Sequence, residues 1–101
     1  MHAIVRENTF DPAKLANAAA QFAEFQDLHS HQPGYAGTIV VDVGEGRQLA
    51  INLWQTPEDA DAALRALAPV VRRIVEPLMD GPSRLVGAGP VAFTDLATAV
   101  D

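Results

Sequence analysis

The chain contains no cysteine, which excludes both a disulfide framework and a thiolate zinc site. Basic residues are also scarce: seven Lys and Arg stand against thirteen Asp and Glu, for a formal net charge of −6. This excess of negative charge disfavours nucleic acid and anionic membranes as partners. No apolar run approaches the ~20 residues that span a bilayer, and the N-terminus does not have the pattern of a secretory signal. We therefore expect a cytoplasmic protein.

Hydrophobic residues are plentiful by contrast, at 49% of 101 residues. That content suits one hydrophobic core and is too little for two. We expect a single domain spanning residues 1–101.

The first third of the chain predicts a strand followed by a helix. Residues 2–10 alternate weakly between apolar and polar, as in a strand. Asp11-Pro12 then supplies an N-cap with proline at the first helical position, and an apolar stripe at helical spacing follows. This helix should end within residues 29–32, before the turn at Pro33-Gly34.

A hairpin and a second capped helix come next. Strands are expected at residues 35–43 and 49–54, joined by a glycine-containing turn at residues 44–47. Thr56-Pro57 repeats the arrangement of N-cap and proline and starts the second helix.

The second helix contains prolines and precedes a last strand. Pro69 and Pro77 should kink this helix or divide it into two segments. The last strand lies somewhere within residues 84–93, where glycines and a proline suggest a bulge or an edge position. The order is therefore βαββαβ, and right-handed crossovers place both helices on one side of a four-stranded antiparallel sheet. The expected fold is ferredoxin-like α+β.

The two sheet faces differ in chemistry. One is aliphatic, and we expect it under the helices because it matches their apolar stripes; it carries Ile39, Val41, Val43, Leu49, Ile51 and Leu53. The other is half apolar and carries Ile4, Val40, Ala50 and Trp54 with His2, Arg6, Asn8, Thr38, Asp42 and Asn52. No segment is left to cover this second face, so we expect a homodimer through it, with a small cavity between the two sheets.

Two short motifs carry a family resemblance. Pro33-Gly34-Tyr35-Ala36-Gly37 opens the second strand, and Leu53-Trp54-Gln55-Thr56 leads into Pro57-Glu58-Asp59-Ala60. Together with the element order, they resemble the antibiotic biosynthesis monooxygenase-like family of the dimeric α+β barrel superfamily. The superfamily includes cofactor-independent monooxygenases, haem-degrading enzymes, isomerases and members without established chemistry.

This resemblance implies a candidate catalytic pair. Asn52 and Trp54 are two residues apart on one strand and project to the same face. In cofactor-free oxygenation of a quinol-like substrate they would donate hydrogen bonds to the developing negative charge. The structural alternative is that Trp54 is an interface aromatic residue whose indole N–H is satisfied by Asn52.

Further polar residues on the same face are candidates for supporting roles. Arg6 and Asn8 could act as additional donors, and His2, Thr38 and Val40 could line the ligand site beside Trp54. Arg6 could instead form a plain ion pair with Asp42, and strand-end polar residues are often only solvated.

No metal or cofactor is expected. His29 and His31 lack further ligands at suitable spacing, and a cap on the helix C-terminus explains them as well. Asn8 matches an asparagine of the haem-degrading relatives, but residues 57–79 contain no histidine to bind haem iron.

The resulting hypothesis is a cofactor-independent monooxygenase for a small aromatic or quinol-type metabolite. The alternatives are a non-catalytic dimer that binds a small hydrophobic ligand, and an assembly module without a ligand.

Overall fold

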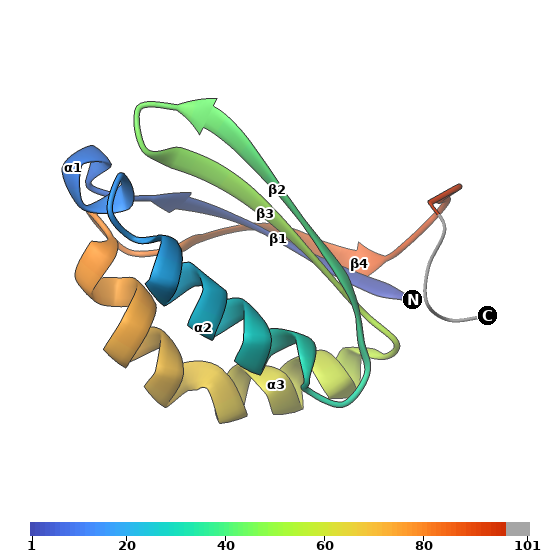
Figure 1. The fold of residues 1–101 in the computed structure, drawn as a ribbon. Helices are drawn as coiled ribbons and strands as arrows, with labels where there is room; N and C mark the ends of the chain where they lie inside the picture. Colours follow the sequence, from blue (N-terminus) through green and yellow to red (C-terminus); the bar gives the residue numbers. More distant parts are fainter. Residues whose placement is uncertain (97–101) are drawn as a thin grey trace.

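The computed structural model describes residues 1–96 (Figure 1). In chain order its elements are β1 (His2–Thr9), α1 (Pro12–Leu15), α2 (Ala19–Ser30), β2 (Tyr35–Gly44), β3 (Arg47–Trp54), α3 (Pro57–Val70), a π-helical turn (Val71–Val75), a 3-10 turn (Glu76–Leu78) and β4 (Arg84–Pro90). Within these residues no helix is long and apolar enough to cross a membrane.

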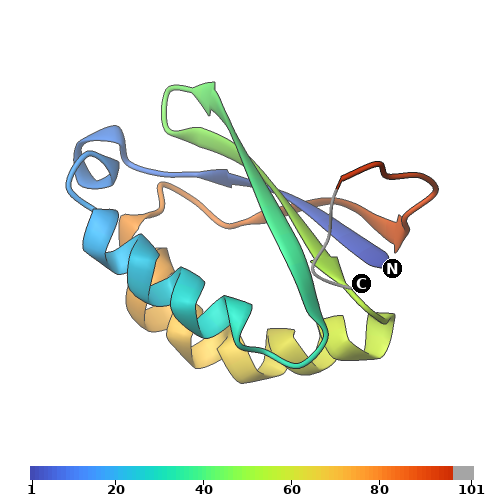
Figure 2. The same ribbon diagram turned by 45° about the vertical axis from the view of Figure 1, so that its right-hand side comes forward.

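Across the described residues the strands form one antiparallel sheet in the order β2-β3-β1-β4. The helices α2 and α3 lie on the same side of this sheet and form a second layer, as Figures 1 and 2 show. The predicted ferredoxin-like α+β fold is therefore confirmed. The last strand is an edge strand, and its pairing with β1 shifts register between Val5 and Arg6, as its glycines suggested.

Both predicted helix starts are capped as the sequence indicated. The Asp11 carboxylate accepts from the backbone N–H of Ala13 at 2.9 Å. The Thr56 hydroxyl accepts from the N–H of Asp59 at 3.0 Å. In each case proline follows at the first helical position, where its missing N–H removes no helical hydrogen bond.

The first helical region is divided, whereas the sequence predicted one helix. Residues 16–18 separate α1 from α2. The N–H groups of Asn17 and Ala18 bond to carbonyls three residues earlier, which tightens and ends the first turn. Ala18 is completely buried at this bend and packs with Phe10.

The prolines divide the second helical region as predicted. Regular helix extends to Val70, one residue beyond Pro69, and a π-helical turn follows. Pro77 lies in the 3-10 turn that ends the segment. From there Met79 bridges back to Phe10, which ties the end of this region to the end of β1.

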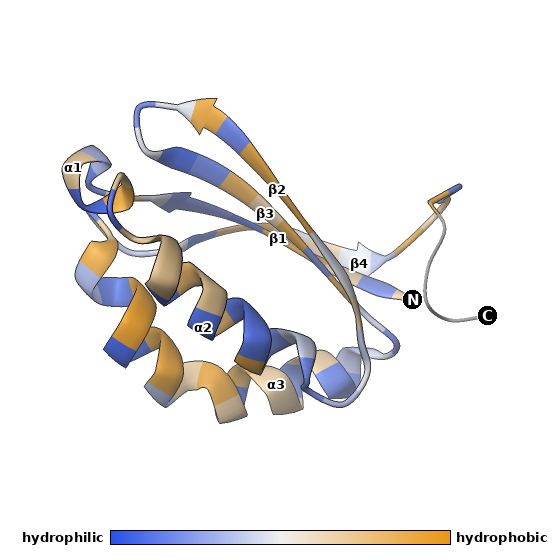
Figure 3. Ribbon diagram, in the orientation of Figure 1, coloured by the Kyte–Doolittle hydropathy of each residue, from blue (hydrophilic) through white to orange (hydrophobic). Residues whose placement is uncertain are grey.

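One sequence prediction about the sheet is wrong: the aliphatic face is not the one under the helices. Trp54, at the end of β3, packs with Ala60, Ala63 and Leu67 of α3, and Phe10 packs with Ile74 and the helices at the other end of β1. The alternation of apolar and polar residues along β2 can be followed in Figure 3. In β1 and β3 the even-numbered residues, like Trp54, form this helix-covered face, and their partners Thr38 and Val40 continue it on β2. The open face carries the aliphatic set Ala3, Val5, Ile39, Val41, Val43, Leu49, Ile51 and Leu53.

The reason lies in the side-chain volumes at the strand ends. Alternation fixes which residues share a face but not which face the helices cover. The bulky rings of Phe10 and Trp54 stand directly before the two helical regions and fill the space beneath them. The smaller aliphatic side chains of the other parity therefore lie on the open face.

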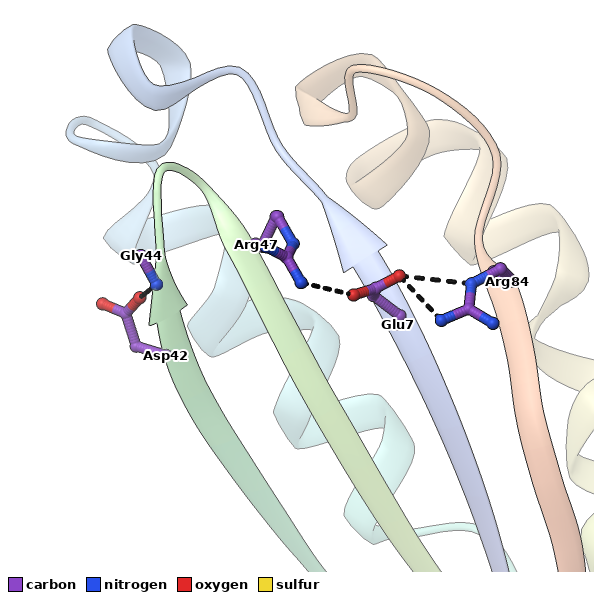
Figure 4. Close-up of polar contacts among 5 residues, drawn as sticks. All are labelled: Glu7, Asp42, Gly44, Arg47 and Arg84. Carbon is purple, nitrogen blue, oxygen red and sulfur yellow. Dashed lines mark hydrogen bonds and ion pairs between the residues drawn. The ribbon is translucent and has the colours of Figure 1, made fainter.

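An ion-pair cluster ties three strands together on that open face (Figure 4). The Glu7 carboxylate of β1 lies 3.0 Å from Arg47 of β3 and 3.0 Å from Arg84 of β4. The hydrogen bonds from Arg47 and then Arg84 hold the pKa of Glu7 below its usual value of 4.5.

Because the pKa of Glu7 is lowered on folding, its ionised form stabilises the fold above about pH 4.5. This contribution is lost as the pH falls through the lowered folded-state pKa. Glu7→Gln should reduce the thermal midpoint at pH 7 and flatten the decline of that midpoint on acidification. Thermal unfolding followed by circular dichroism between pH 3 and 7 tests this, with Glu24→Gln as a control at an exposed pair. An unchanged pH profile in Glu7→Gln would contradict the assignment.

Candidate functional site

A cavity of about 710 Å³ lies between the sheet and the helices. Its size falls within the range of small-molecule sites. The sheet contributes Ile4, Arg6, Asn8, Thr38, Val40, Gln48, Ala50, Asn52 and Trp54. Facing them are Phe22, Phe25, Gln26 and His29 of α2, Ala60, Ala63, Leu64 and Leu67 of α3, and Val71 and Val75 of the π-helical turn. The core clusters around Phe10 and Trp54 lie at its two ends.

The structure therefore brings most of the sequence-predicted site residues together around one cavity within a single chain. Asn52, Trp54, Arg6 and Asn8 line it, as do Thr38 and Val40. The predicted location between two sheets is corrected: this cavity lies between sheet and helices. His2 is half-buried opposite Trp54 in the sheet and does not line the cavity.

Trp54 is buried but keeps a free donor. Its side chain is only 3% exposed, and its indole packs edge-on against His29 and Tyr35 at 5.4 and 5.8 Å between ring centroids. Within residues 1–96 the indole N–H has no hydrogen-bond partner, and no fully buried side-chain nitrogen or oxygen is left unpaired. The N–H must therefore lie within reach of water, and the cavity that Trp54 lines provides that access. It does not bond Asn52, contrary to the structural alternative.

A directional chain of hydrogen bonds orients Asn52. Gln26 Nε2 donates to the Tyr35 hydroxyl at 3.0 Å, and that hydroxyl donates to Thr38 Oγ1 at 2.9 Å. The Thr38 hydroxyl then donates to Asn52 Oδ1 at 3.1 Å. Each hydroxyl has one proton to give, so the carboxamide of Asn52 must present its oxygen to Thr38. Its NH₂ group stays without a partner among the described residues and is free to donate in the cavity.

His29 lines the cavity and was not recognised from the sequence. It is 5% exposed, stacks on Phe25 at 5.4 Å and meets Tyr35 edge-on at 5.1 Å. Burial lowers the pKa of His29 below its usual 6.5, because the apolar surroundings disfavour the charged form. The available signal was its position four residues after Phe25 and seven after Phe22, on the stripe that faces the sheet.

His31 instead fulfils the capping role that the sequence predicted for both histidines. Its exposed ring contacts the backbone carbonyl of Asp27 at 2.6 Å, near the end of α2. Residues 1–96 contain no cluster of three His, Asp or Glu side chains that could hold a metal ion.

Arg6 supplies positive charge to the cavity. It lies opposite Ala50, two positions from Asn52 on the same face, and Asn8 lies opposite Gln48. The alternative ion pair with Asp42 is not formed, because β3 separates β1 from β2 and Asp42 accepts from the N–H of Gly44 at 2.8 Å. Arg6 has no carboxylate partner within the described part of the chain.

A smaller hollow of about 460 Å³ lies beside the segment that leads into β4. Its walls include Val71, Glu76 and Met79 with the loop at residues 81–83. The predicted catalytic residues are absent from this hollow.

Comparison with known proteins gives a match in structure but not in sequence. No family model matches the chain, and no curated protein does. Among solved structures, SnoaB, a cofactor-independent oxygenase from Streptomyces nogalater in a mutant form, matches with a TM-score of 0.73 and 20% identity, over 92% of this chain and 94% of that chain.

Two further solved structures show the same similarity. One is an antibiotic biosynthesis monooxygenase, with a TM-score of 0.72, 14% identity, and coverage of 90% of this chain and 98% of that one. The other is the protein of unknown function NE2512 from Nitrosomonas europaea, with a TM-score of 0.77, 14% identity, and coverage of 95% and 93%. The chain therefore has the fold of the antibiotic biosynthesis monooxygenase structures, as its motifs suggested.

Proposed function

We propose that the protein is a cofactor-independent monooxygenase for a small aromatic or quinol-type metabolite bound between the sheet and the helices. The observation that carries this proposal is the pair of unpaired donors, the Asn52 carboxamide and the Trp54 indole, in a largely apolar cavity. The likeness to a cofactor-independent oxygenase supports it.

The chemistry needs no external reductant. The ionised substrate supplies the electrons to O₂. In an anthrone-type substrate a ring CH₂ becomes C=O with one oxygen atom, in a quinol a ring C–H becomes C–OH as the ring is oxidised to the quinone, and in both cases the other oxygen atom leaves as water. Negative charge grows on the substrate oxygen as its hydroxyl ionises. Asn52 and Trp54 would donate to that oxygen in a site with little water, where such hydrogen bonds are strongest.

Arg6 and Asn8 of β1 would act as additional hydrogen-bond donors, next to Asn52 on the helix-covered face of the sheet. An arginine without a carboxylate partner attracts a substrate that carries negative charge. This role is a supporting one, because the aromatic walls and the two unpaired donors lie around Trp54.

The first test is oxygen consumption with quinol and anthrone-type substrates. Removing one donor to a developing oxyanion typically lowers the rate about 10²–10³-fold, so Asn52→Ala and Trp54→Phe should each lose activity on that scale. Asp42→Asn, a polar change outside the cavity lining, is the control. Undiminished turnover in both site variants would show that the chemistry lies elsewhere. Binding of an aromatic ligand without turnover in the parent would favour the non-catalytic binding module.

The chain that orients Asn52 makes a separate prediction. Thr38→Val keeps the shape of the side chain but removes the hydroxyl that donates to Asn52 Oδ1. The carboxamide is then free to rotate, so kcat should fall while KM changes little. Thr38→Ser restores the hydroxyl and should restore kcat. Equal kcat values for Thr38→Val and the parent would show that Thr38 does not position Asn52 for catalysis.

The open face supports assembly into a homodimer. Val5, Ile51 and Ile39 form a row across β1, β3 and β2, and Ile39 and Val41 are 39% and 42% exposed. Contiguous apolar surface of this kind usually marks an interface, and a two-fold axis would bring the same face of a second copy onto it. This face replaces the one that the sequence prediction assigned to the dimer.

Ile51→Glu should separate the dimer, because Ile51 lies in the middle of that row and a carboxylate there would be buried without a partner. Light scattering after gel filtration measures the mass, and circular dichroism confirms that the variant is folded. Ala66→Glu, on the exposed side of α3, is the matched control and should stay dimeric. A monomeric parent at micromolar concentration would contradict the homodimer.

A further inference from the structure

We propose that His29 is the base of this site: its Nε2 accepts the hydroxyl proton of the bound substrate. The inference rests on the proposed cavity function, and it assigns a catalytic role to a residue that the sequence motifs did not indicate.

The hydrogen-bond chain fixes which nitrogen of His29 carries a proton. Gln26 donates through Nε2 to Tyr35, so its other terminal atom, Oε1, faces His29 Nδ1 at 3.4 Å. A carboxamide oxygen can only accept, and therefore Nδ1 must be the protonated nitrogen. In the neutral ring, Nε2 then has a free lone pair.

This lone pair is accessible. Nε2 makes no hydrogen bond within residues 1–96, yet no fully buried side-chain nitrogen there is left unpaired. Because His29 is nearly buried and lines the cavity, the cavity is where Nε2 meets a ligand. The rings of Phe25, Tyr35 and Trp54 hold the imidazole in place on several sides.

One network thus sets an acceptor and a donor at the same end of the cavity. The hydrogen bond from His29 Nδ1 to Gln26 Oε1 leaves Nε2 of His29 with a free lone pair. The chain of hydrogen bonds from Gln26 Nε2 through the two hydroxyl groups leaves Asn52 with a free NH₂. The indole of Trp54, whose N–H is also free, lies 5.4 Å from the imidazole between ring centroids. A phenolic O–H placed here would give its proton to His29 and have its oxygen held by Asn52 and Trp54.

The proton step is balanced. The O–H bond of the substrate breaks, its electron pair stays on oxygen, and the proton bonds to Nε2 to give an imidazolium beside a phenolate. The opposite charges stabilise each other in the apolar cavity. The proton later returns to the oxygen atom that leaves as water.

The surroundings keep His29 neutral before substrate binds. Burial lowers its pKa, so the free base predominates at neutral pH. Of the titratable groups, Tyr35 of β2 faces the ring, with its hydroxyl engaged by Gln26 and Thr38. The charged residue of α3 near the start of β2 is Asp59, whose side chain packs against Gly34. The charged residue that the sheet contributes to the cavity is Arg6 of β1.

The test uses 4-nitrophenol as the probe, because its ionised form absorbs at longer wavelength. With the parent, the bound probe should ionise at lower pH than the free probe. His29→Gln should raise the apparent pKa of the bound probe by about one to three units relative to the parent, the effect of losing an adjacent opposite charge. His31→Gln, at the exposed end of the same helix, should match the parent.

A second measurement reports the tautomer without any ligand. In ¹⁵N spectra of the histidine side chains, the neutral form of His29 should show a bare Nε2 and a protonated Nδ1. A protonated Nε2, or equal probe ionisation in His29→Gln and the parent, would overturn the inference. Failure of the probe to bind the folded parent would also overturn it.

Oxygen uptake separates this inference from the proposed function. If probe ionisation depends on His29 but no substrate consumes oxygen, the base assignment stands and the oxygenase proposal fails. If oxygen is consumed, kcat/KM should rise as the pH increases through the lowered pKa of His29. In His29→Gln this rise in the pH profile should be absent.

Discussion

The placement of two aromatic rings decides the rest of the structure. Phe10 directly follows β1 and Trp54 ends β3, and both lie under the helices, where Phe10 meets Phe22 edge-on at 5.3 Å. Since successive side chains of a strand alternate, Trp54 assigns the even-numbered residues of β3 to the helix-covered face, and strand pairing extends this assignment to their partners in β1 and β2. Asn52, Thr38 and Arg6 must then face the helices. The aliphatic residues must face outward.

A polar face under helices carries a cost that the structure meets in two ways. Thr38, Tyr35 and Gln26 satisfy one another in a single chain that ends at Asn52 and His29. The remaining donors and the lone pair of His29 open on the cavity rather than being sealed in the core. The same arrangement that keeps these groups solvated leaves them free to bind a ligand. Function and packing are therefore linked at this end of the sheet.

The sequence predicted the fold well because its signals were local. Asp11-Pro12 and Thr56-Pro57 marked the helix starts, and alternation placed Asn52 and Trp54 on one face. The prediction of which sheet face the helices cover was wrong. Alternation divides the residues of a strand between two faces but does not say which face is covered, and here the volume of Phe10 and Trp54 decides it. His29 was missed because its burial depends on β2 and β3, which are distant in sequence and close in space. The break at residues 16–18 also depends on packing, around Ala18.

The central claim is that the functional cavity lies between the sheet and the helices of one chain. Trp54 is the only tryptophan, so its indole N–H gives a single, assignable NMR signal. Nuclear Overhauser effects from a bound aromatic hydroxyl ligand test the claim most directly. The account predicts contacts from the ligand to the Trp54 indole N–H and to the ring protons of His29. Contacts to the methyl groups of Ile51 and Val41 on the open face, without contacts to Trp54, would contradict it.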